Sequence, residues 1–342
     1  MRYIGRPPLT SDSIDGEAAV TPAIRAAGWQ FAGRSAIYVA DFNAFGTPAM
    51  SGATIPFRKM NGLGNEFIVF DARERPIHLA PIAIRELGAP SAIGFDQMIT
   101  LERSPKHADA FMRIHNRDGG EVDACGNATR CVGWLLMGES GGKSATIETN
   151  AGLLRAFDTG RPQTIAVDMD APKFGWRDIP LAEEFRDTRA IELQIGPIDM
   201  PILHSPSAVS MGNPHAIFWV DDVEAYDLER IGPLLENHPT FPERANISLA
   251  HVTAPDAITV KTWERGAGIT KACGTAACAV AVAAARKGLT GRHVTVTLPG
   301  GALDIDWRAD DHVWMTGPVA TEFEGTLDPN TLEWEASARG AA

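Results

Sequence analysis

A long-range repeat within the chain constrains its fold more than any other feature of the sequence. The segment GNEFIVF begins at Gly64, and ACGNATRC follows it with a cysteine at position 125. A similar pair of segments, GNPHAIFWV and ACGTAACA, begins at Gly212 and has its cysteine at position 273. The distance from Gly64 to Gly212 is 148 residues, and the distance from Cys125 to Cys273 is also 148 residues. Two matches that share one offset predict two similar domains in one chain.

A segment of helical character follows each of these cysteines. After Cys273, the run AACAVAVAAARKG is apolar on nearly all sides and ends before Gly288, which is typical of a buried helix with a glycine stop. Gly126 and Gly274 would let the backbone approach its neighbours closely. The apolar positions after Cys125 recur at helical spacing, at Ala128, Cys131, Val132, Leu135 and Leu136.

Most of the remaining chain consists of short strand-like runs separated by Gly, Asp, Asn or Pro. They are FIVFDA, FMRIHN, ATIETN, TIAVDM, AIFWV, ITVKTWE, HVTVTLP and ALDIDW. Together with the repeat, they predict a mixed α/β (α+β) protein of two similar domains, each with strands wrapped around a central helix. The active site is expected in the cleft between the domains.

The chain of 342 residues predicts four segments. Residues 1–55, rich in proline and small polar residues, are expected to be a poorly ordered N-terminal extension. Residues 56–195 and 196–330 form the two similar domains, and residues 331–342 a tail. Because recognisable patterns begin just after Met50, we also expect that translation starts there.

Charge and hydropathy argue against nucleic-acid binding, membrane insertion and secretion. The net charge of −12 disfavours nucleic acid and anionic membrane surfaces, whose phosphates would be repelled. The longest small-apolar stretch is about 14 residues, too short to span a bilayer. No secretory signal is evident in the first residues, so we expect a cytoplasmic protein with free thiols.

A zinc site is the first alternative use of the four cysteines. Their spacings are C-x₅-C and C-x₄-C on helices, whereas zinc sites favour two-residue knuckles, so no metal is predicted. Cys131 and Cys278 each fall one turn inside a helix, where a thiol is usually a small buried hydrophobe.

Two cysteines at two helix starts suggest a reaction. A helix N-terminus has unpaired N–H groups and a partial positive charge, so it is expected to lower a thiol pKa toward neutrality and to bind a carboxylate. If two such termini face one another, one carboxylate can be held with a sulfur on each side of its α-carbon. One sulfur then removes the α-proton as a thiolate, and the other delivers a proton to the opposite face. Such a two-base epimerase needs no cofactor.

At these residues the sequence resembles the diaminopimelate epimerase family, from about residue 57 to residue 325. The matching motifs are FRKMNGLGNEF, GFDQ, HNRDGGEVDACGNATRC, MGNPHAIF, ERANI, ERGAGITKACGTAACA and MTGPV. The resemblance implies a cofactor-independent homodimer that interconverts LL- and meso-diaminopimelate for lysine and peptidoglycan precursor biosynthesis.

The resemblance also implies a role for particular residues. Cys125 and Cys273 match the catalytic acid/base pair, and His215 with Glu264 matches the pair that tunes the thiols. The backbone donors for the reacting carboxylate match Gly126, Asn127, Gly274 and Thr275. Residues that contact the substrate match Asn65, Gln97, Asn116, Asn213, Asn246, Glu264 and Arg265. The family usually has Asp in place of Glu66, which affects the packing behind Asn65.

Two other functions stay open at this point. A proline or hydroxyproline racemase of the same fold would also use two cysteines, but it would not need the Glu264–Arg265 pair to hold a distal amino-acid end. A non-enzymatic, two-lobed amino-acid-binding protein would explain two similar domains, but not a cysteine at each helix start. A pyridoxal enzyme is disfavoured because no lysine has a recognisable Schiff-base context.

Overall fold

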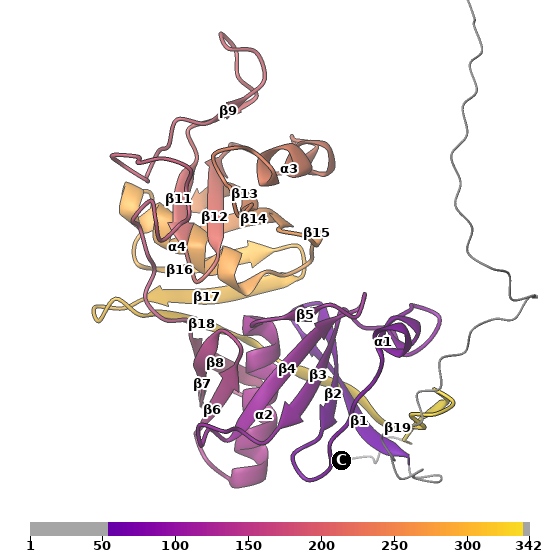
Figure 1. The fold of residues 1–342 in the computed structure, drawn as a ribbon. Helices are drawn as coiled ribbons and strands as arrows, with labels where there is room; N and C mark the ends of the chain where they lie inside the picture. Colours follow the sequence, from indigo (N-terminus) through magenta and orange to yellow (C-terminus); the bar gives the residue numbers. More distant parts are fainter. Residues whose placement is uncertain (1–53, 338–342) are drawn as a thin grey trace, which may run out of the picture. The chain divides into compact units, whose positions relative to one another are not determined.

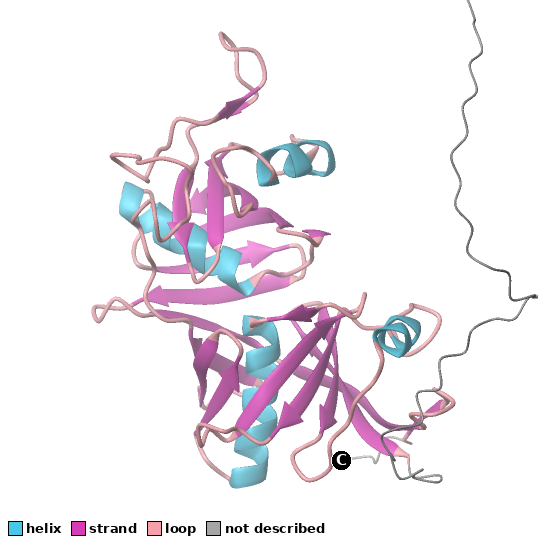
Figure 2. Cartoon of the chain, viewed as in Figure 1, coloured by secondary structure: helices cyan, strands magenta, loops and turns pink. Residues whose placement is uncertain are grey.

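The computed structural model describes residues 54–337 (Figure 1). The chain divides into two units, Met1–Met50 and Ser51–Ala342, and all described residues belong to the second. The predicted extension over residues 1–55 lies outside the described residues except for residues 54 and 55, and the predicted translation start at Met50 also lies outside them. Strands predominate over helices in the described part (Figure 2).

The first half of the described chain is a set of strands with one long helix, α2. Its elements in order are β1 (Ile55–Gly62), β2 (Asn65–Asp71), α1 (Pro81–Leu87), β3 (Gln97–Glu102), β4 (Ala110–Asn116), β5 (Glu121–Val122), α2 (Gly126–Ser140), β6 (Ser144–Thr149), β7 (Gly152–Asp158) and β8 (Thr164–Asp168).

The second half repeats the same order of elements. They are β11 (Ser207–Ser210), β12 (Pro214–Trp219), α3 (Leu228–Glu236), β13 (Asn246–Ala254), β14 (Ala257–Glu264), β15 (Gly268–Ile269), α4 (Gly274–Lys287), β16 (His293–Leu298), β17 (Gly301–Trp307) and β18 (Val313–Pro318). Between the halves lies a small hairpin of β9 (Gln194–Ile195) and β10 (Leu203–His204), and the chain ends with β19 (Ala320–Leu327) and β20 (Trp334–Ala336).

Strand pairing is duplicated as well as element order. In the first half β2 pairs with β3 in parallel, β3 with β4 antiparallel, and β4 with β6 in parallel. In the second half β12 pairs with β13 in parallel, β13 with β14 antiparallel, and β14 with β16 in parallel. The 148-residue repeat in the sequence is therefore a repeat of structure, and the predicted fold class is confirmed. All eight strand-like runs also lie on strands.

Two antiparallel pairs join the halves. Strand β8 pairs with β18, and β19 pairs with β1 over most of their length. After completing the second half, the chain thus returns to the sheet of the first, as the yellow strand beside β1 shows in Figure 1. The division at residues 195 and 196 stays a prediction, and the pairing adds that residues 320–327 lie in the first sheet.

The two central helices begin where the sequence predicted, and the second ends at the predicted glycine. Helix α2 begins after Cys125 and ends at Gly141, and α4 begins after Cys273 and ends at Gly288. Both terminal glycines have left-handed backbone, which glycine adopts without steric cost. Helix α4 is buried on nearly all sides because its alanines let strands β11–β18 pack closely around it. No helix among residues 54–337 is long and apolar enough to cross a membrane.

Candidate active site

Cys125 and Cys273 are the N-cap residues of the two central helices. Both have extended backbone, and the first helical hydrogen bonds run from Thr129 N to Cys125 O (2.9 Å) and from Ala277 N to Cys273 O (3.1 Å). The three N–H groups that follow each cysteine are therefore free of helical bonds. Each cysteine thus stands at a cluster of backbone donors, as the sequence predicted.

The first residue of each helix is glycine because Met315 fills the adjacent space. A β-carbon added at Gly274 would lie 2.8 Å from Met315 Sδ, and one added at Gly126 would lie 3.0 Å from Met315 Cε. Both separations are shorter than normal carbon contacts. One methionine of strand β18 therefore packs against both helix starts, and the close approach expected of these glycines is confirmed.

The side chain of Asn127 connects the two helix starts. Its Nδ2 donates to the carbonyl of Ala272, the residue before Cys273, at 3.1 Å, and to Asn65 Oδ1 at 3.4 Å. Its Oδ1 accepts from Arg130 Nη1 at 3.0 Å. Asn127 is only 2% exposed, so these bonds are shielded from water. The amide of Asn127 therefore links the two halves directly at the predicted site.

Around Cys125, the predicted amide side chains form two separate hydrogen-bonded groups. The Cys125 thiol donates to Asn65 Oδ1 at 3.9 Å, and Asp96 Oδ2 accepts from Asn65 Nδ2 at 3.0 Å. Gln97 Nε2 donates to Asn116 Oδ1 at 3.0 Å across the β3–β4 pair. Gln97 follows Asp96 in the chain, and Asn116 lies opposite Gln97 on β4; the two amides bond to each other rather than to Asn65.

Glu66, which follows Asn65 in the chain, pairs with a lysine and not with the Asn65 side chain. Its carboxylate forms an ion pair with Lys59 at 2.6 Å, while Asp96 holds the side chain of Asn65. The replacement of Asp by Glu at this position therefore does not leave Asn65 unsupported.

Around Cys273, the predicted residues of the second half form a corresponding set. Asn213 Nδ2 donates to Thr275 Oγ1 at 3.4 Å, and Asn213 Oδ1 lies 2.8 Å from His215 Nε2. Thr275 Oγ1 in turn lies 3.5 Å from Cys273 Sγ. Cys273, Thr275, Asn213 and His215 are thereby joined in one chain of polar contacts.

Asn246 and Arg265 form a neighbouring pair. Asn246 donates to the carbonyl of Pro214 at 3.1 Å and accepts from the backbone N–H of Arg265 at 2.9 Å. The guanidinium of Arg265 is exposed and donates to the carbonyl of Glu243 at 3.0 Å. Asn246 therefore fixes the backbone of Arg265, while direct contact of either side chain with a substrate stays a prediction.

The pKa values of the two thiols correct one expectation. Burial raises the pKa of Cys125 to about 11, although bonds from the N–H groups of Ala128 and Asn127 lower it. Burial also raises the pKa of Cys273 well above its ordinary value, and the Glu264 charge adds to the increase. The expected pKa near neutrality is therefore wrong for the protein without a substrate, because desolvation outweighs the helix terminus.

His215 is fully buried, and Glu264, which is partly buried, is hydrogen-bonded to Cys273. Burial raises the pKa of Glu264, while hydrogen bonds from Thr270 and Cys273 lower it. Burial and the positive charge of Arg265 lower the pKa of His215 to about 3, so its ring is neutral at physiological pH. Glu264 therefore lies at Cys273 and also raises the pKa of Cys125, whereas His215 reaches Cys273 only through Asn213 and Thr275.

Three residues that the sequence analysis did not single out belong to this site. Asp96 orients Asn65, Met315 packs on both helix starts, and Arg130 bonds to Asn127. Asp96 lies within the motif GFDQ and Met315 within MTGPV, but the neighbouring residues in the sequence do not indicate what either side chain contacts. Arg130 gave no local signal either, because at helical spacing it falls opposite the apolar positions Ala128 and Cys131, where a charged side chain is usually exposed.

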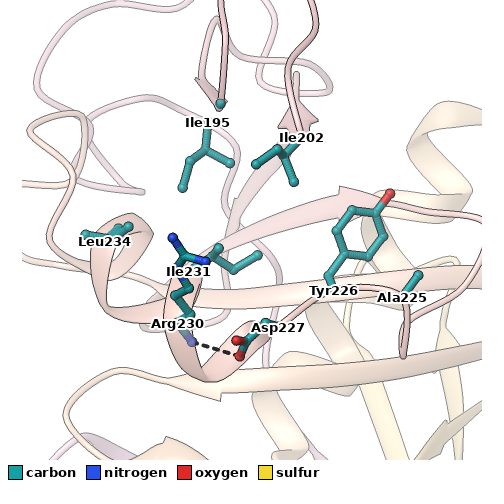
Figure 3. A pocket seen from close by; sticks show the side chains of 9 residues that line it. Ile195, Ile202, Ala225, Tyr226, Asp227, Arg230, Ile231 and Leu234 are labelled. Carbon is teal, nitrogen blue, oxygen red and sulfur yellow. Dashed lines mark hydrogen bonds between the residues drawn. The ribbon is translucent and has the colours of Figure 1, made fainter.

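Two hollows occur away from the cysteines. Arg186, Asp187, Arg189 and Arg286 line an open polar one. The other, about 340 Å³ in volume, lies between the β9–β10 hairpin and α3, and Figure 3 shows Ile195, Ile202 and Leu234 around it. None of the predicted site residues lines either hollow. Within residues 54–337, no group of three or more His, Cys, Asp or Glu side chains is placed to share a metal ion.

Solved structures of low sequence identity share this fold. A predicted epimerase from Pseudomonas aeruginosa is 20% identical with a TM-score of 0.55, and the match covers 80% of this chain and 99% of that one. A hydroxyproline epimerase from Agrobacterium vitis, with bound trans-4-hydroxy-L-proline, is 15% identical with a TM-score of 0.56, over 80% and 92% of the two chains.

Curated relatives of much higher identity carry one name. A diaminopimelate epimerase from Afipia carboxidovorans is 60% identical over 276 residues, which are 80% of this chain and 95% of the relative. One from Brucella anthropi is 58% identical over 286 residues, or 83% of this chain and 95% of the relative. The model of the family described as diaminopimelate epimerase matches residues 57–175 and 207–322. The resemblance inferred from the motifs is therefore confirmed, and the chain belongs to the diaminopimelate epimerase family.

Proposed function

We propose that this chain is an epimerase that interconverts LL- and meso-diaminopimelate by transferring an α-proton between Cys125 and Cys273. The observation that carries the proposal is the placement of both cysteines at the starts of two equivalent buried helices, which the Asn127 amide joins through Ala272. The relatives' shared name and their high identity support the choice of substrate.

The reacting carboxylate lies between the two helix starts in this proposal. The backbone N–H groups of Gly126, Asn127, Gly274 and Thr275 are free of helical bonds and would donate to its oxygens. The same donors stabilise the enediolate that forms when the α-proton leaves, because negative charge then moves onto the carboxylate oxygens. Preorganised donors in a site shielded from water are usually the largest contribution to such stabilisation.

The proton transfers balance without a cofactor. One cysteine, as a thiolate, takes the α-proton and becomes a thiol. The other, a thiol at the start, gives its proton to the opposite face of the α-carbon and becomes a thiolate. The substrate carbon is inverted, one negative charge has moved between sulfurs, and the reverse reaction exchanges the two roles.

Substrate binding supplies the thiolate in this mechanism. In the free protein the negative charge of Glu264 raises the pKa of both Cys125 and Cys273. A substrate ammonium that pairs with Glu264 would cancel this repulsion and lower the thiol pKa values. The base is then formed where the substrate is present, and the free enzyme keeps its thiols protonated.

The distal amino-acid end requires its own contacts. Arg265 has an exposed planar guanidinium that can pair with the distal carboxylate, and its backbone is fixed by Asn246. Amide side chains can serve both carboxylate and ammonium because they donate and accept. The remaining substrate contacts in the proposal are Asn65, Gln97, Asn116 and Asn213.

The proposed reaction implies a compartment, an oligomeric state and a domain arrangement for the enzyme. The product serves lysine and peptidoglycan precursor biosynthesis, which places the enzyme in the cytoplasm. The family resemblance implies a homodimer, and light scattering after size-exclusion chromatography would give twice the monomer mass. The two domains are residues 56–195 and 196–330, with the cleft between them as the substrate site.

The test is α-proton exchange in heavy water. The protein is incubated with LL-diaminopimelate in D₂O with reductant and no added cofactor. Chiral separation follows the meso isomer, and mass spectrometry follows deuterium at the α-carbon. We expect conversion with deuterium incorporation, and loss of conversion by at least about 10²-fold in both Cys125→Ala and Cys273→Ala.

Cys278→Ala provides the matched control. Cys278 is fully buried one turn inside α4, so its loss removes core packing without removing either proposed acid/base group. Turnover should persist in this variant. Exchange of proline or hydroxyproline without exchange of diaminopimelate would replace the proposed substrate with that of a racemase. Absence of exchange with all three would favour an amino-acid-binding protein.

A further inference from the structure

Arg130 is a fully buried cation for which no carboxylate partner exists among the described residues. Its exposed fraction is 0%, and no ion pair within residues 54–337 includes it. Its Nη1 donates to Asn127 Oδ1 at 3.0 Å and lies 3.5 Å from Met315 Sδ. Its Nε and Nη2 have no hydrogen-bond partner.

Such an arrangement is costly unless an anion compensates it. Removal of a guanidinium from water has a large free-energy cost, and neighbouring negative charges usually offset this cost. Lys59, which is also buried, has Glu66 and Glu322 as partners. Arg130 has no equivalent, so its charge is balanced only when negative charge forms at the site.

The ionisable groups around Arg130 are thiols from both central helices. Burial lowers the pKa of Arg130, and the charges of three thiols raise it. These thiols are Cys131 and Cys125 on α2 and Cys278 on α4. Glu264 on β14 acts on Cys125 and Cys273 instead, and Asp96 acts on Glu264. The positive charge of Arg130 therefore favours the Cys125 thiolate, while the negative charge of Glu264 disfavours it.

Arg130 also determines which way the Asn127 amide points. Because Nη1 is a donor, it must face the amide oxygen, and this leaves Asn127 Nδ2 to donate to Ala272 O and Asn65 Oδ1. Strand β18 encloses the guanidinium, since a β-carbon at Gly317 would lie 3.2 Å from Arg130 Cζ. The bond from α2 to the residue before Cys273 thus depends on a rigidly held arginine.

We propose that Arg130 is a positioning residue for the two-thiol reaction. It fixes the Asn127 amide that joins the two helix starts, and its unpaired charge stabilises the negative charge that the reaction places between them. This inference rests on the proposed function. A merely structural role predicts a loss of stability with little effect on kcat. The positioning role predicts the reverse, because replacement of a buried charge by an apolar side chain is often neutral or stabilising.

The test compares Arg130→Met with Arg130→Lys and with the control Arg286→Met. Arg286 lies near the end of α4, far along the helix from Cys273, and packs over Phe174. Three quantities are measured for the full chain: the unfolding temperature, kcat and KM for LL-diaminopimelate, and the pH dependence of Cys125 alkylation by iodoacetamide. The alkylated peptide is resolved by mass spectrometry.

For Arg130→Met we expect an unfolding temperature at or above that of the wild type and a kcat reduced by about 10²-fold or more, with KM changed far less. The midpoint of Cys125 alkylation should move to higher pH, because a positive charge near the thiolate is lost. Arg130→Lys should keep the alkylation midpoint near that of the wild type and still lower kcat, since a lysine keeps the charge but not the planar fork. Arg286→Met should change neither kcat nor the midpoint.

Wild-type kcat with a wild-type alkylation midpoint in Arg130→Met would overturn the inference. If Arg130→Met does not fold, Arg130→Lys decides, and a wild-type kcat in that variant overturns the positioning role. If the wild type does not turn over diaminopimelate, the proposed function fails, whereas the alkylation midpoint still reads the effect of Arg130 on the thiol. An unchanged midpoint in Arg130→Met then overturns the inference as well.

Discussion

The carboxylate of Glu264 illustrates how one residue can both suppress and enable the chemistry. Its charge raises the pKa of Cys125 and Cys273, in addition to the larger effect of burial. A free enzyme with protonated thiols is protected from oxidation and alkylation, because the thiolate is the reactive form. The same carboxylate is the natural partner of the substrate ammonium in the proposed mechanism.

Substitution of Glu264 should therefore separate reactivity from turnover. In Glu264→Gln the negative charge is lost, the thiol pKa values fall, and the thiolate fraction at pH 8 rises. We expect iodoacetamide to alkylate Cys273 several-fold faster than in the wild type, since a shift of one pKa unit changes the thiolate fraction about tenfold. Epimerisation should fall by about 10²-fold, because the ammonium contact is lost.

Glu243→Gln is the control for this measurement. Glu243 is exposed, and only its backbone carbonyl contacts Arg265, so its alkylation and turnover rates should match those of the wild type. Slower or unchanged alkylation in Glu264→Gln would contradict the assigned direction of the Glu264 effect.

The proposed acid/base residues can be recognised in the sequence more easily than the residues that pack against them. Cys125 and Cys273 were identifiable because each precedes a glycine and an apolar run at the same point of a repeat. Arg130 and Met315 were missed because their contacts depend on two helices and a strand that meet only in the folded chain. The thiol pKa values were predicted in the wrong direction, since local position at a helix start carries no information about burial.

At the scale of the element, helix α2 shows how close packing supports the site. Gly133 lies on its buried face, where a β-carbon would overlap Cβ of Ala156 on β7. Gly138 lies on the same helix in open space, with no atom within 4 Å of such a β-carbon. The two glycines therefore allow one substitution to be compared at a packed and at an open position.

Gly133→Ala should destabilise the protein by about 1–3 kcal/mol, because an inserted methyl group forces β7 away from α2. Gly138→Ala should stabilise it by about 0.5–1 kcal/mol, since alanine loses less backbone entropy in a helix. Urea unfolding monitored by circular dichroism measures both values. Equal stability of the two variants would show that α2 and β7 are not packed as closely as described.

The strands divide into those that local patterns predict and those that only the fold defines. The eight runs named from the sequence lie on strands because each alternates or clusters apolar residues between turn residues. The two-residue strands β5, β15, β9 and β10 are too short to leave such a signal. The pairing of β19 with β1 was not predicted, because two strands more than 250 residues apart carry no local sign of their contact.

At the scale of the whole molecule, the two halves share one core and two strand pairs. The largest hydrophobic cluster includes Met60 and Val132 from the first half and Val280 and Val296 from the second. Asn127 and Arg130 join the halves at the site, while β8–β18 and β1–β19 join the sheets. We therefore expect the described residues to unfold as one cooperative unit although the sequence is a repeat.

Removal of β19 and β20 tests this coupling. A chain that ends at Pro318 loses Leu327, which is fully buried, and the contacts of Phe323 and Trp334 with Phe57. Full burial of a leucine or phenylalanine contributes about 1.5–3 kcal/mol, so the loss of Leu327 and the exposure of Phe57 remove a large part of the stability that is typical of a protein. Strand β1 would also become an edge with unpaired backbone groups.

We expect the chain that ends at Pro318 to aggregate or to lose its cooperative thermal transition, whereas a chain that ends at Ser337 should unfold at the wild-type temperature. Activity should be lost together with the fold, because Gly62 at the end of β1 packs against the backbone of Asn127, and a β-carbon there would lie 3.1 Å from Asn127 O. Size-exclusion chromatography and scanning calorimetry measure the outcome. A chain that ends at Pro318, does not aggregate and unfolds at the wild-type temperature would mean that the first half completes its sheet without the last strands. The return of the chain would then not be what couples the halves.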